Sequence, residues 1–414
     1  MKIAIIGGGI SGMVAAYLLN QDHDITLFEA NDYIGGHTHT IDVPTNGRTY
    51  AVDTGFIVFN ETTYTNFCKL INRLGVASQP STMTFSVKCE KTGLEYGAHS
   101  LNTFFAQRKN LLSPSFYRMI LDMFRFRRDF DRLLSDDRGE QELGPYLTRK
   151  GYSHRFIDHF LIPLGSSLWS ADPKDIRNFP LLTFVRFFEN HGFLKVRHPI
   201  HWKVIQGGSR QYVKKLTASY EEKIRLKTPI RGVTRHPDHV EVHPKDSDPR
   251  RFDHVVMTVH SDQALEMLTD PSPAEREILG AIPYQENLTV LHTDSSILPK
   301  RHSLWSSWNY LIPNEEISRA ALTYDMNILQ TISAPVEFCV TLNRPEAIAL
   351  EKVIGTFVYH HPIYRREAPQ AQQRHGEISG KNRTHYCGAY WGYGFHEDGV
   401  NAALAACRFF GRGL

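Results

Sequence analysis

Three glycines near the start of the chain have the spacing that binds the phosphates of a dinucleotide. They follow an apolar segment, residues 2–6, and precede a segment with helical character. The first glycine of a G-x-G-x-x-G pattern permits a tight turn, the second lets backbone approach a pyrophosphate, and the third lets the helix pack against the strand. Amides at the helix start would then face the phosphates. The expected contacts are Gly7, Gly9, Ile10, Ser11 and Gly12.

A carboxylate stands where such a site needs one for the sugar. Glu29 ends a second apolar segment, residues 24–29, and lies seventeen positions after Gly12. This is close to the spacing of roughly 20 residues for an acid that accepts hydrogen bonds from ribose hydroxyls. Strand, glycines, helix, strand and acid follow in order, which favours a dinucleotide site over an isolated glycine turn. Ala30, beside Glu29, is expected to line the same site.

A parallel sheet covered by helices is needed to position these residues, and the rest of the chain has the matching pattern. Residues 253–259 form a short apolar run of the kind buried in a parallel sheet. Residues 101–195 are aromatic-rich and helical in character, and residues 284–345 contain further strands. At 414 residues the chain is long enough for two domains. The pattern predicts an α/β fold with a helical insertion.

The composition excludes several classes of protein. A formal net charge of +3 gives no dominant basic field, so no nucleic-acid partner is expected. Five scattered cysteines without a C-x-x-C pair predict neither a disulfide framework nor a metal site, and they favour a reducing, cytoplasmic setting. No apolar run approaches the roughly 20 residues that span a bilayer. The N-terminal residues have the pattern of a strand rather than of a cleaved leader.

Motifs at both ends of the chain carry a resemblance to a known superfamily. The N-terminal glycines, the Gly35-Gly36 pair and residues 388–400 together resemble the FAD-dependent amine oxidase and phytoene desaturase superfamily. Within it, the chain is most similar to a bacterial group of NAD/FAD-binding oxidoreductases associated with fatty-acyl, cyclopropane-type lipid modification. The strings that carry this similarity lie at residues 36–38, 53–60, 308–310 and 394–399.

The resemblance implies a fold and its division. The expected fold is α/β, with a Rossmann-like, GR2-type FAD-binding domain and an inserted α+β substrate domain. The FAD-binding domain would comprise residues 1–80, 196–270 and 355–414. The substrate domain would comprise residues 81–195 and 271–354.

The resemblance also implies FAD as the cofactor and extends its site. Val233 would meet the adenine through its backbone, and amides at residues 398–400 would face the flavin pyrimidine oxygens. Two departures affect single contacts, because His37 stands where an arginine is usual and Ala389 where an acidic residue is common. The further expected contacts are Gly35, Gly36, His37, Thr38, Gly55, Phe56, Val233, Gly388, Asp398, Gly399 and Val400.

Three side chains are candidates for the chemistry beside the flavin. His396 is expected to act there as a base or polar anchor, or to pack against the flavin edge. His360 precedes a proline where relatives place cofactor-facing strand residues, and Asp53 follows a strand end on the cofactor side. Amine oxidases hold a water near flavin N5 with a lysine, but residues 282–289 contain no lysine and an approximate alignment gives Thr289. This counts against a standard amine oxidase.

The expected activity is removal of a hydride from an organic, apolar or fatty-acyl substrate, of desaturase or oxidase type. Four aromatic residues would line a channel for such a substrate or belong to the core: Tyr390, Trp391, Tyr393 and Phe395. A flavin amine oxidase, a non-redox flavin isomerase and a non-catalytic FAD-binding partner of a lipid-modifying enzyme remain alternatives.

A basic segment offers a contact with the inner face of a membrane. Residues 116–132 have helical periodicity, and arginines recur near one face of the expected helix. The alternative is a solvated surface helix, which three acidic residues favour because they dilute the positive charge. The arginines are Arg118, Arg125, Arg128 and Arg132, and the acids are Asp122, Asp129 and Asp131.

Overall fold

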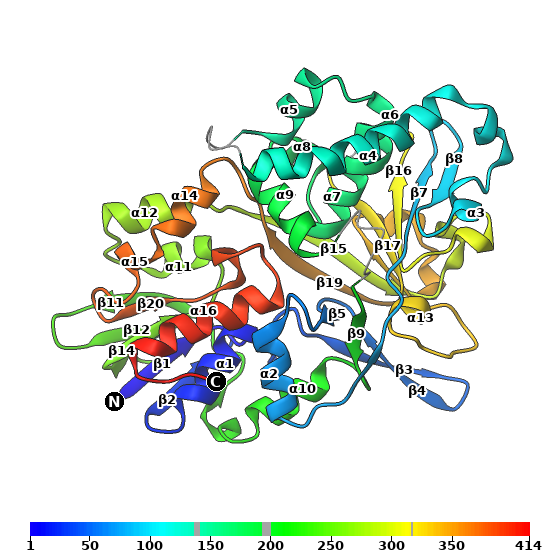
Figure 1. Cartoon of the computed structure of the whole chain (residues 1–414). Coiled ribbons are helices and arrows are strands. Elements are labelled where there is room, and N and C mark those ends of the chain that lie inside the picture. Colours follow the sequence, from blue (N-terminus) through cyan, green and yellow to red (C-terminus); the bar gives the residue numbers. More distant parts are fainter. Residues whose placement is uncertain (136–140, 193–199, 316–317) are drawn as a thin grey trace.

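A computed structural model describes residues 1–135, 141–192, 200–315 and 318–414. Its lower half in Figure 1 is built on a five-stranded parallel sheet of order β10-β2-β1-β14-β20. These strands come from three distant parts of the chain. The central strands β1, β2 and β14 are mainly apolar and buried, because helices and loops cover both faces of the sheet. The strands are β1 (Lys2–Ile6), β2 (Asp24–Phe28), β10 (Ile224–Arg225), β14 (His254–Met257) and β20 (Thr384–Tyr386).

Two helices from opposite ends of the chain lie side by side against this sheet (Figure 1). Helix α1 begins directly after the glycine turn, and nine of its ten residues are buried between the sheet and α16. The chain therefore closes its fold by bringing its last helix onto its first. The helices of this half are α1 (Ile10–Leu19), α2 (Thr65–Arg73), α10 (Arg210–Thr217), α11 (Ser261–Met267), α12 (Pro273–Gly280), α14 (Ala368–Gln373), α15 (His375–Ile378) and α16 (His396–Phe409).

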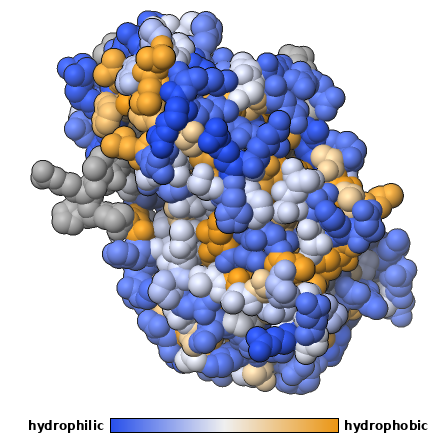
Figure 2. All heavy atoms as spheres, turned by 90° about the vertical axis from the view of Figure 1, so that its right-hand side faces the viewer, coloured by the Kyte–Doolittle hydropathy of each residue, from blue (hydrophilic) through white to orange (hydrophobic). Residues whose placement is uncertain are grey.

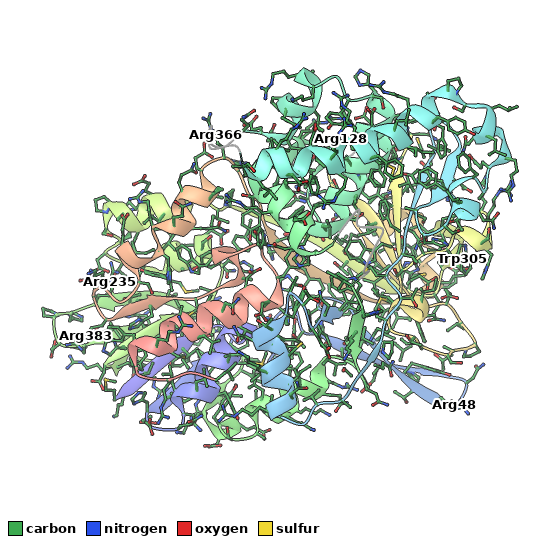
Figure 3. The ribbon with its side chains drawn as sticks, in the orientation of Figure 1. Arg48, Arg128, Arg235, Trp305, Arg366 and Arg383 are labelled. Carbon is green, nitrogen blue, oxygen red and sulfur yellow. The ribbon has the colours of Figure 1, made fainter. Side chains whose placement is uncertain are left out.

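A small antiparallel sheet, β11-β12-β13, is tied to the parallel sheet by a buried ion pair. Arg235, labelled in Figure 3, donates to Glu275 of α12 over 3.0 Å, and Tyr386 of β20 donates to the same carboxylate over 2.6 Å. Three elements thus meet on one carboxylate. The strands are β11 (Ile230–Arg235), β12 (Val240–Pro244) and β13 (Arg250–Phe252).

The other half of the molecule contains a seven-stranded sheet of order β19-β15-β18-β17-β16-β7-β8. Residues 355–362 lie in β19 of this sheet, although the predicted division places them in the FAD-binding domain. The long strands β15 and β19 run between the two halves in Figure 1. The strands are β7 (Phe85–Cys89), β8 (Leu94–Gly97), β15 (Tyr284–His292), β16 (Trp308–Ile312), β17 (Ala321–Asp325), β18 (Cys339–Leu342) and β19 (Val353–Pro362).

A group of helices covers the seven-stranded sheet, where the sequence predicts a helical insertion. Phenylalanine, tyrosine and leucine side chains of these helices belong to a core cluster that also includes residues of both large sheets. The segments are α3 (Leu101–Phe104), the 3-10 turn η1 (Arg108–Leu112), α4 (Pro114–Leu134), α5 (Leu143–Arg149), α6 (His154–Phe156), the π turn η2 (Ile157–Leu161), α7 (Ile162–Trp169), α8 (Pro173–Arg177) and α9 (Leu181–Asn190). Within the described ranges, no helix is both long and apolar enough to cross a membrane.

Short strands join the two halves. They form a hairpin, β3-β4, and a three-stranded sheet, β5-β9-β6, and a short helix lies close to them. These elements are β3 (Thr40–Thr45), β4 (Arg48–Asp53), β5 (Val58–Asn60), β6 (Ser78–Pro80), β9 (Trp202–Ile205) and α13 (Met326–Leu329).

Candidate functional site

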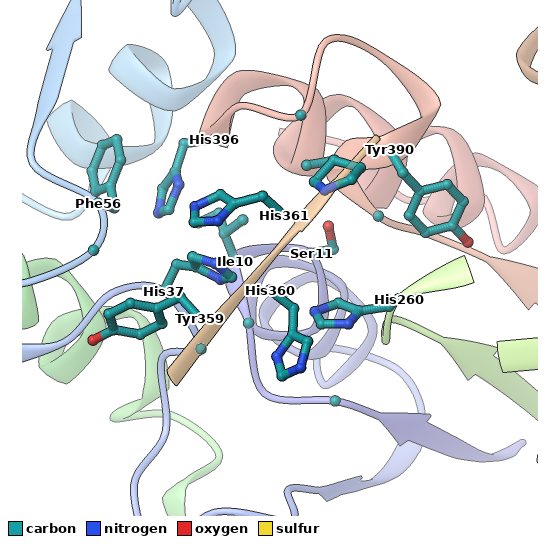
Figure 4. A pocket seen from close by; sticks show the side chains of 18 of the residues that line it. Ile10, Ser11, His37, Phe56, His260, Tyr359, His360, His361, Tyr390 and His396 are labelled. Carbon is teal, nitrogen blue, oxygen red and sulfur yellow. The ribbon is translucent and has the colours of Figure 1, made fainter. Parts of the chain in front are cut away.

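A cavity of about 910 Å³ lies between the two halves, at the carboxyl ends of the parallel strands. We call its two parts the glycine end and the aromatic end. The glycine end is lined mainly by the loops after β1 and β2, and the aromatic end by the helical insertion and the seven-stranded sheet. Figure 4 shows part of the lining, including several histidines. Parallel sheets commonly bind ligands beyond the carboxyl ends of their strands.

The glycine turn has the geometry that a phosphate cradle requires. Gly7 has a φ of +108°, and a Cβ at Gly12 would clash with the Gly7 carbonyl oxygen. A Cβ at Gly9 would instead meet nothing within 4 Å, and Gly9, Ile10 and Ser11 line the cavity. Gly7 and Gly12 therefore form the turn, while Gly9 leaves open space at the N-terminus of α1. This space leaves room for an anion, which would face the helix amides.

The carboxylate of Glu29, at the end of β2, is fixed by two backbone amides. Its Oε2 accepts the Gly8 amide over 2.7 Å and its Oε1 accepts the Asn31 amide over 2.8 Å. Each carboxylate oxygen keeps a second lone pair that can accept a hydroxyl. Glu29 and Ala30 both line the cavity, as the ribose assignment requires.

The second glycine pair passes directly across the first turn. Gly36 has a φ of +60°, and a Cβ on it would lie 3.0 Å from the Cα of Gly9. The next residue, His37, is half-buried, and its Nε2 is shielded from solvent without a hydrogen-bond partner among the described residues. Burial lowers the pKa of His37 to about 4, so this side chain is neutral at pH 7. It can offer a bound group a hydrogen bond, but not the positive charge of the arginine it replaces.

The start of α16 is clamped onto the start of α1. Ser11 donates from Oγ to the Gly399 carbonyl over 2.9 Å, and a Cβ on Gly399 would meet Ile10 at 2.6 Å. Gly388 and His396 line the cavity, whereas six predicted cofactor contacts do not. These are Gly12, Thr38, Val233, Asp398, Gly399 and Val400.

Asp398 has a supporting position. Its Oδ2 accepts the backbone amides of Tyr393 and Phe395, each over 3.0 Å. Burial raises the pKa of this carboxyl to about 7. Asp398 thus fixes the loop before α16, which carries aromatic side chains into the cavity.

Val233 lies away from the cavity, in contrast to its predicted contact with adenine. It is fully buried in β11, pairs with Val242, and its carbonyl accepts the Thr269 amide over 3.1 Å. Ile230 and Arg231, at the start of the same strand, line the cavity instead. The sequence thus indicates the strand that reaches the cavity, but the residues facing it are at the start of the strand.

Asp53 is surrounded by protein donors and does not line the cavity. Its carboxylate accepts Thr40 Oγ1 over 2.5 Å, the Ser209 hydroxyl over 2.8 Å and Gln330 Nε2 over 2.8 Å, and the Ser209 amide as well. Burial raises its pKa to about 6. The carboxylate joins β4 to α10 and α13, so the geometry gives it a positioning role rather than contact with a substrate. Gly55 and Phe56, just after it, do line the cavity.

His396 lies flat on Phe56. The two ring centroids are 3.4 Å apart, and His396 Nε2 is 3.0 Å from both Thr38 Oγ1 and Tyr212 Oη. Burial holds the pKa of His396 well below its usual range. A neutral ring with one nitrogen already engaged suits the packing and anchoring interpretation better than that of a base.

Four further histidines line the cavity near strand β19 (Figure 4). His361 contacts Asn287 through Nδ1 over 2.9 Å, while the half-exposed His360 has its Nε2 3.9 Å from Glu286. His260 stacks on Tyr284 with ring centroids 4.1 Å apart, and burial lowers its pKa to about 3. Sequence reasoning missed His260, although its place just after β14 was a usable signal. The four are His37, His260, His360 and His361.

The aromatic end has no ionised side chain among its described residues. Burial lowers the pKa of its one histidine, His191, to about 4. Phe395 lines this end and stacks on Phe187, and Trp169 donates to the Tyr393 carbonyl over 3.1 Å. The remaining side chains are aromatic, aliphatic or hydroxyl-bearing. The lining here comprises Ile57, Val58, Met83, Ser167, Leu168, Trp169, Ser170, Phe187, His191, Trp202, Trp308, Tyr324, Leu329 and Phe395.

No lysine is found among the described residues that line the cavity. Thr289, the residue aligned with the amine oxidase lysine, is fully buried in β15 and does not line it. The same strand contributes Tyr284 to the cavity.

Comparison with known proteins agrees with this geometry. A family model described as flavin-containing amine oxidoreductase matches residues 10–295. Cyclohexylamine oxidase from Brevibacterium oxydans IH-35A is 16% identical, with 99% of each chain covered and a TM-score of 0.70. The CLA-producing fatty acid isomerase from P. acnes is 19% identical, with 99% of this chain and 98% of that chain covered and a TM-score of 0.64.

A curated relative matches only a short stretch. Tryptophan 2-monooxygenase from Allorhizobium ampelinum is 54% identical over 41 residues, which is 9% of this chain and 6% of that protein. The family match spans more than half of the chain, and the open space at Gly9, Glu29 and the unpartnered His37 nitrogen fit the phosphates and sugar of FAD. The chain therefore belongs to the flavin-containing amine oxidoreductase family and is an FAD-dependent oxidoreductase.

Proposed function

We propose that this oxidoreductase removes a hydride from an apolar substrate, such as a fatty acyl chain, in a reaction of desaturase or oxidase type. The observation that carries the proposal is the aromatic end of the cavity, where no described side chain is ionised. An apolar chain gains free energy by leaving water for such a lining, whereas a charged substrate would lose its hydration without gaining a partner. The contrast with the charged groups at the glycine end favours a neutral substrate.

FAD, when bound, supplies a two-electron acceptor for a hydride. The chain's own residues would position it: the turn at Gly9 and the start of α1 hold the phosphates, and Glu29 holds the ribose. Amides at the start of α16 stabilise negative charge on a group beside them. The aromatic end holds the substrate and excludes water. Dioxygen or a quinone is the class of acceptor that would take up the electrons afterwards.

Formation of a carbon–carbon double bond also releases a proton from the neighbouring carbon. His360 is the candidate acceptor, because it lines the cavity and its half-exposed ring connects with solvent. His360→Gln should lower kcat and change its pH profile while the flavin content stays at the wild-type level. An unchanged pH profile would remove His360 from the proton path.

Amine oxidation is the alternative that the family match favours. Among the described residues, the lining has no lysine and the aromatic end has no carboxylate, which supports the apolar substrate instead. A fatty acid isomerase is among the structures with this fold, so isomerisation without net electron transfer is a third outcome.

Anaerobic titration of the FAD-loaded protein separates these functions. Bleaching of the flavin by fatty acyl substrates, and not by amines, is the expected result. Bleaching by amines alone would overturn the apolar assignment. Conversion of an acyl chain only after chemical reduction of the flavin would identify an isomerase, and flavin binding without any turnover would identify a non-catalytic partner.

A further inference from the structure

Hydrophobic side chains are exposed in a group on α3, η1 and the first half of α4. Leu112 is 87% exposed, Leu101 is 80% exposed, and Leu121 and Phe124 are each 63% exposed. Figure 2 looks onto the side of the molecule that carries α3 and β8, and hydrophobic residues gather in its upper part beside strongly hydrophilic ones. Exposed leucines are common singly, but a group of them marks an interaction surface.

The residues of α4 form a stripe along one side of the helix. Tyr117, Leu121, Phe124 and Arg128 are spaced by four, three and four residues and are all exposed, so they lie on one face. The opposite face packs into the core through Phe116, Met119 and other apolar residues. We call the exposed stripe, together with Leu101, Leu111 and Leu112, the α4 face.

Charge around the α4 face is positive. Residues 101–135 contain seven basic and three acidic side chains. Two of the acids point into the protein: Asp122 is 1% exposed and accepts the Ser153 amide over 2.9 Å, and Asp129 is 6% exposed and accepts Tyr152 Oη over 2.8 Å. The exposed basic residues are Arg108, Lys109, Arg118, Arg128 and Arg132, and Asp131 is the exposed acid.

The acids that would dilute the charge of a free helix are thus mostly turned inward. Asp122 also pairs with Arg118 over 3.3 Å, which leaves Arg128 and Arg132 as the clearest exposed cations of α4. Figure 3 labels Arg128 on the outer side of the helical group. Exposed leucine and phenylalanine flanked by arginine is the combination that binds a lipid surface, because the apolar groups insert and the cations meet anionic headgroups.

We propose that the α4 face docks on an anionic lipid bilayer. The docking itself is independent of the proposed function. Its role, uptake of an acyl substrate from the membrane, rests on that function. A protein partner would not require a net positive face, and a second copy of this chain would place two positive faces together, which like-charge repulsion opposes. The charge of the face therefore favours an anionic lipid surface.

Vesicle sedimentation of the full, FAD-loaded chain tests the docking. The protein should sediment with vesicles of phosphatidylcholine and phosphatidylglycerol, not with phosphatidylcholine alone, and about 0.5 M salt should release it. Arg128→Gln with Arg132→Gln should weaken binding about twenty-five-fold, at about fivefold for each charge. Leu112→Asn should weaken it about tenfold through lost insertion of an apolar side chain.

Matched substitutions elsewhere serve as controls. Leu350→Asn alters a leucine that is 86% exposed, and Arg48→Gln with Arg73→Gln alters exposed arginines on β4 and α2, so neither should change binding. Absence of wild-type binding, or equal losses in controls and α4 variants, would overturn the proposal. A dimer that Leu112→Asn dissociates, without vesicle binding, would identify a second copy as the occupant. Sedimentation does not depend on turnover, so its failure is distinct from failure of the proposed function.

Discussion

The glycine end of the cavity is built mainly from backbone, whereas the aromatic end is built from side chains that are far apart in the sequence. At the glycine end, Gly7, Gly9 and Gly36 set the shape through φ angles and close approaches, and Glu29 supplies a charge. At the aromatic end, Trp169 and Trp308 come from a helix and a strand with no local motif in common.

Because of this difference, the two ends have different functions. Backbone amides bind a feature that all dinucleotides share, the pyrophosphate, and they do so with little freedom for substitution. Side-chain walls can change one residue at a time, so they set which substrate is accepted. We therefore expect substitutions of the turn glycines to abolish cofactor binding and substitutions at the aromatic end to change substrate affinity alone.

The largest effect is expected for Gly12→Ala. The added Cβ would clash with the Gly7 carbonyl oxygen and lie 2.7 Å from Thr258 Oγ1, and the clashing atom is backbone that cannot move aside. We expect a loss of more than about 3 kcal/mol in stability and a protein without FAD. The flavin absorbance of the purified protein and its thermal unfolding measure both. Gly376→Ala, where a Cβ meets nothing within 4 Å, is the matched control. A Gly12→Ala protein that binds FAD and unfolds at the wild-type temperature would contradict the inference that the turn cannot accommodate a side chain.

The roles of the residues at the glycine end could be predicted from the sequence, because each role depends on a few residues nearby in the chain. The turn, Glu29 and the second glycine pair all lie within the first 36 residues and all line or shape the cavity. Asp53 could not be placed in the same way. Its partners Ser209 and Gln330 are 156 and 277 residues away, and only the folded chain shows that they satisfy its carboxylate.

At two other sites, strand register and helical spacing decide which side chains face inward. The resemblance predicts an adenine contact at Val233, but strand register decides which residue faces the cavity, and pairing with β12 fixes that register. On α4, Asp122 and Asp129 are seven residues apart and share a face with the apolar Met119 and Phe126, so their inward orientation followed from helical spacing.

The second effect concerns Asp398, which connects the two ends by holding the loop of Tyr393 and Phe395. With its pKa raised to about 7, the folded state keeps a proton that the unfolded chain has released between pH 4 and 7. Stability therefore falls as the pH rises through that range, by on the order of 3 kcal/mol. Asp398→Asn keeps an oxygen for both amides but does not titrate. Urea unfolding at pH 5 and pH 8 should show a smaller fall for the variant than for the wild type. An equal fall in stability for both proteins would show that the pKa of Asp398 is not raised into this pH range.

The third effect should be confined to the aromatic end. Leu168→Glu places a carboxylate in the uncharged lining without touching the glycine turn. Because an apolar chain would then lie against a charge, we expect affinity for cis-parinaric acid, measured by fluorescence, to fall about thirtyfold while the flavin content stays unchanged. Leu168→Met preserves volume and should behave as the wild type. Loss of flavin from the glutamate variant would show that the two ends are not independent.

The smallest effect is expected for His37, where this chain has a neutral ring in place of a cation. His37→Leu removes one uncharged hydrogen bond, which should weaken FAD binding by about tenfold or less. Because the pKa of His37 is lowered to about 4, the ring is neutral throughout pH 6 to 9, and its contribution to FAD affinity should not vary across that range. Titration calorimetry of wild type and variant at several pH values measures this. An affinity difference that grows as the pH falls from 8 to 6 would mean that bound FAD raises the pKa of His37 and that the ring binds phosphate as a cation.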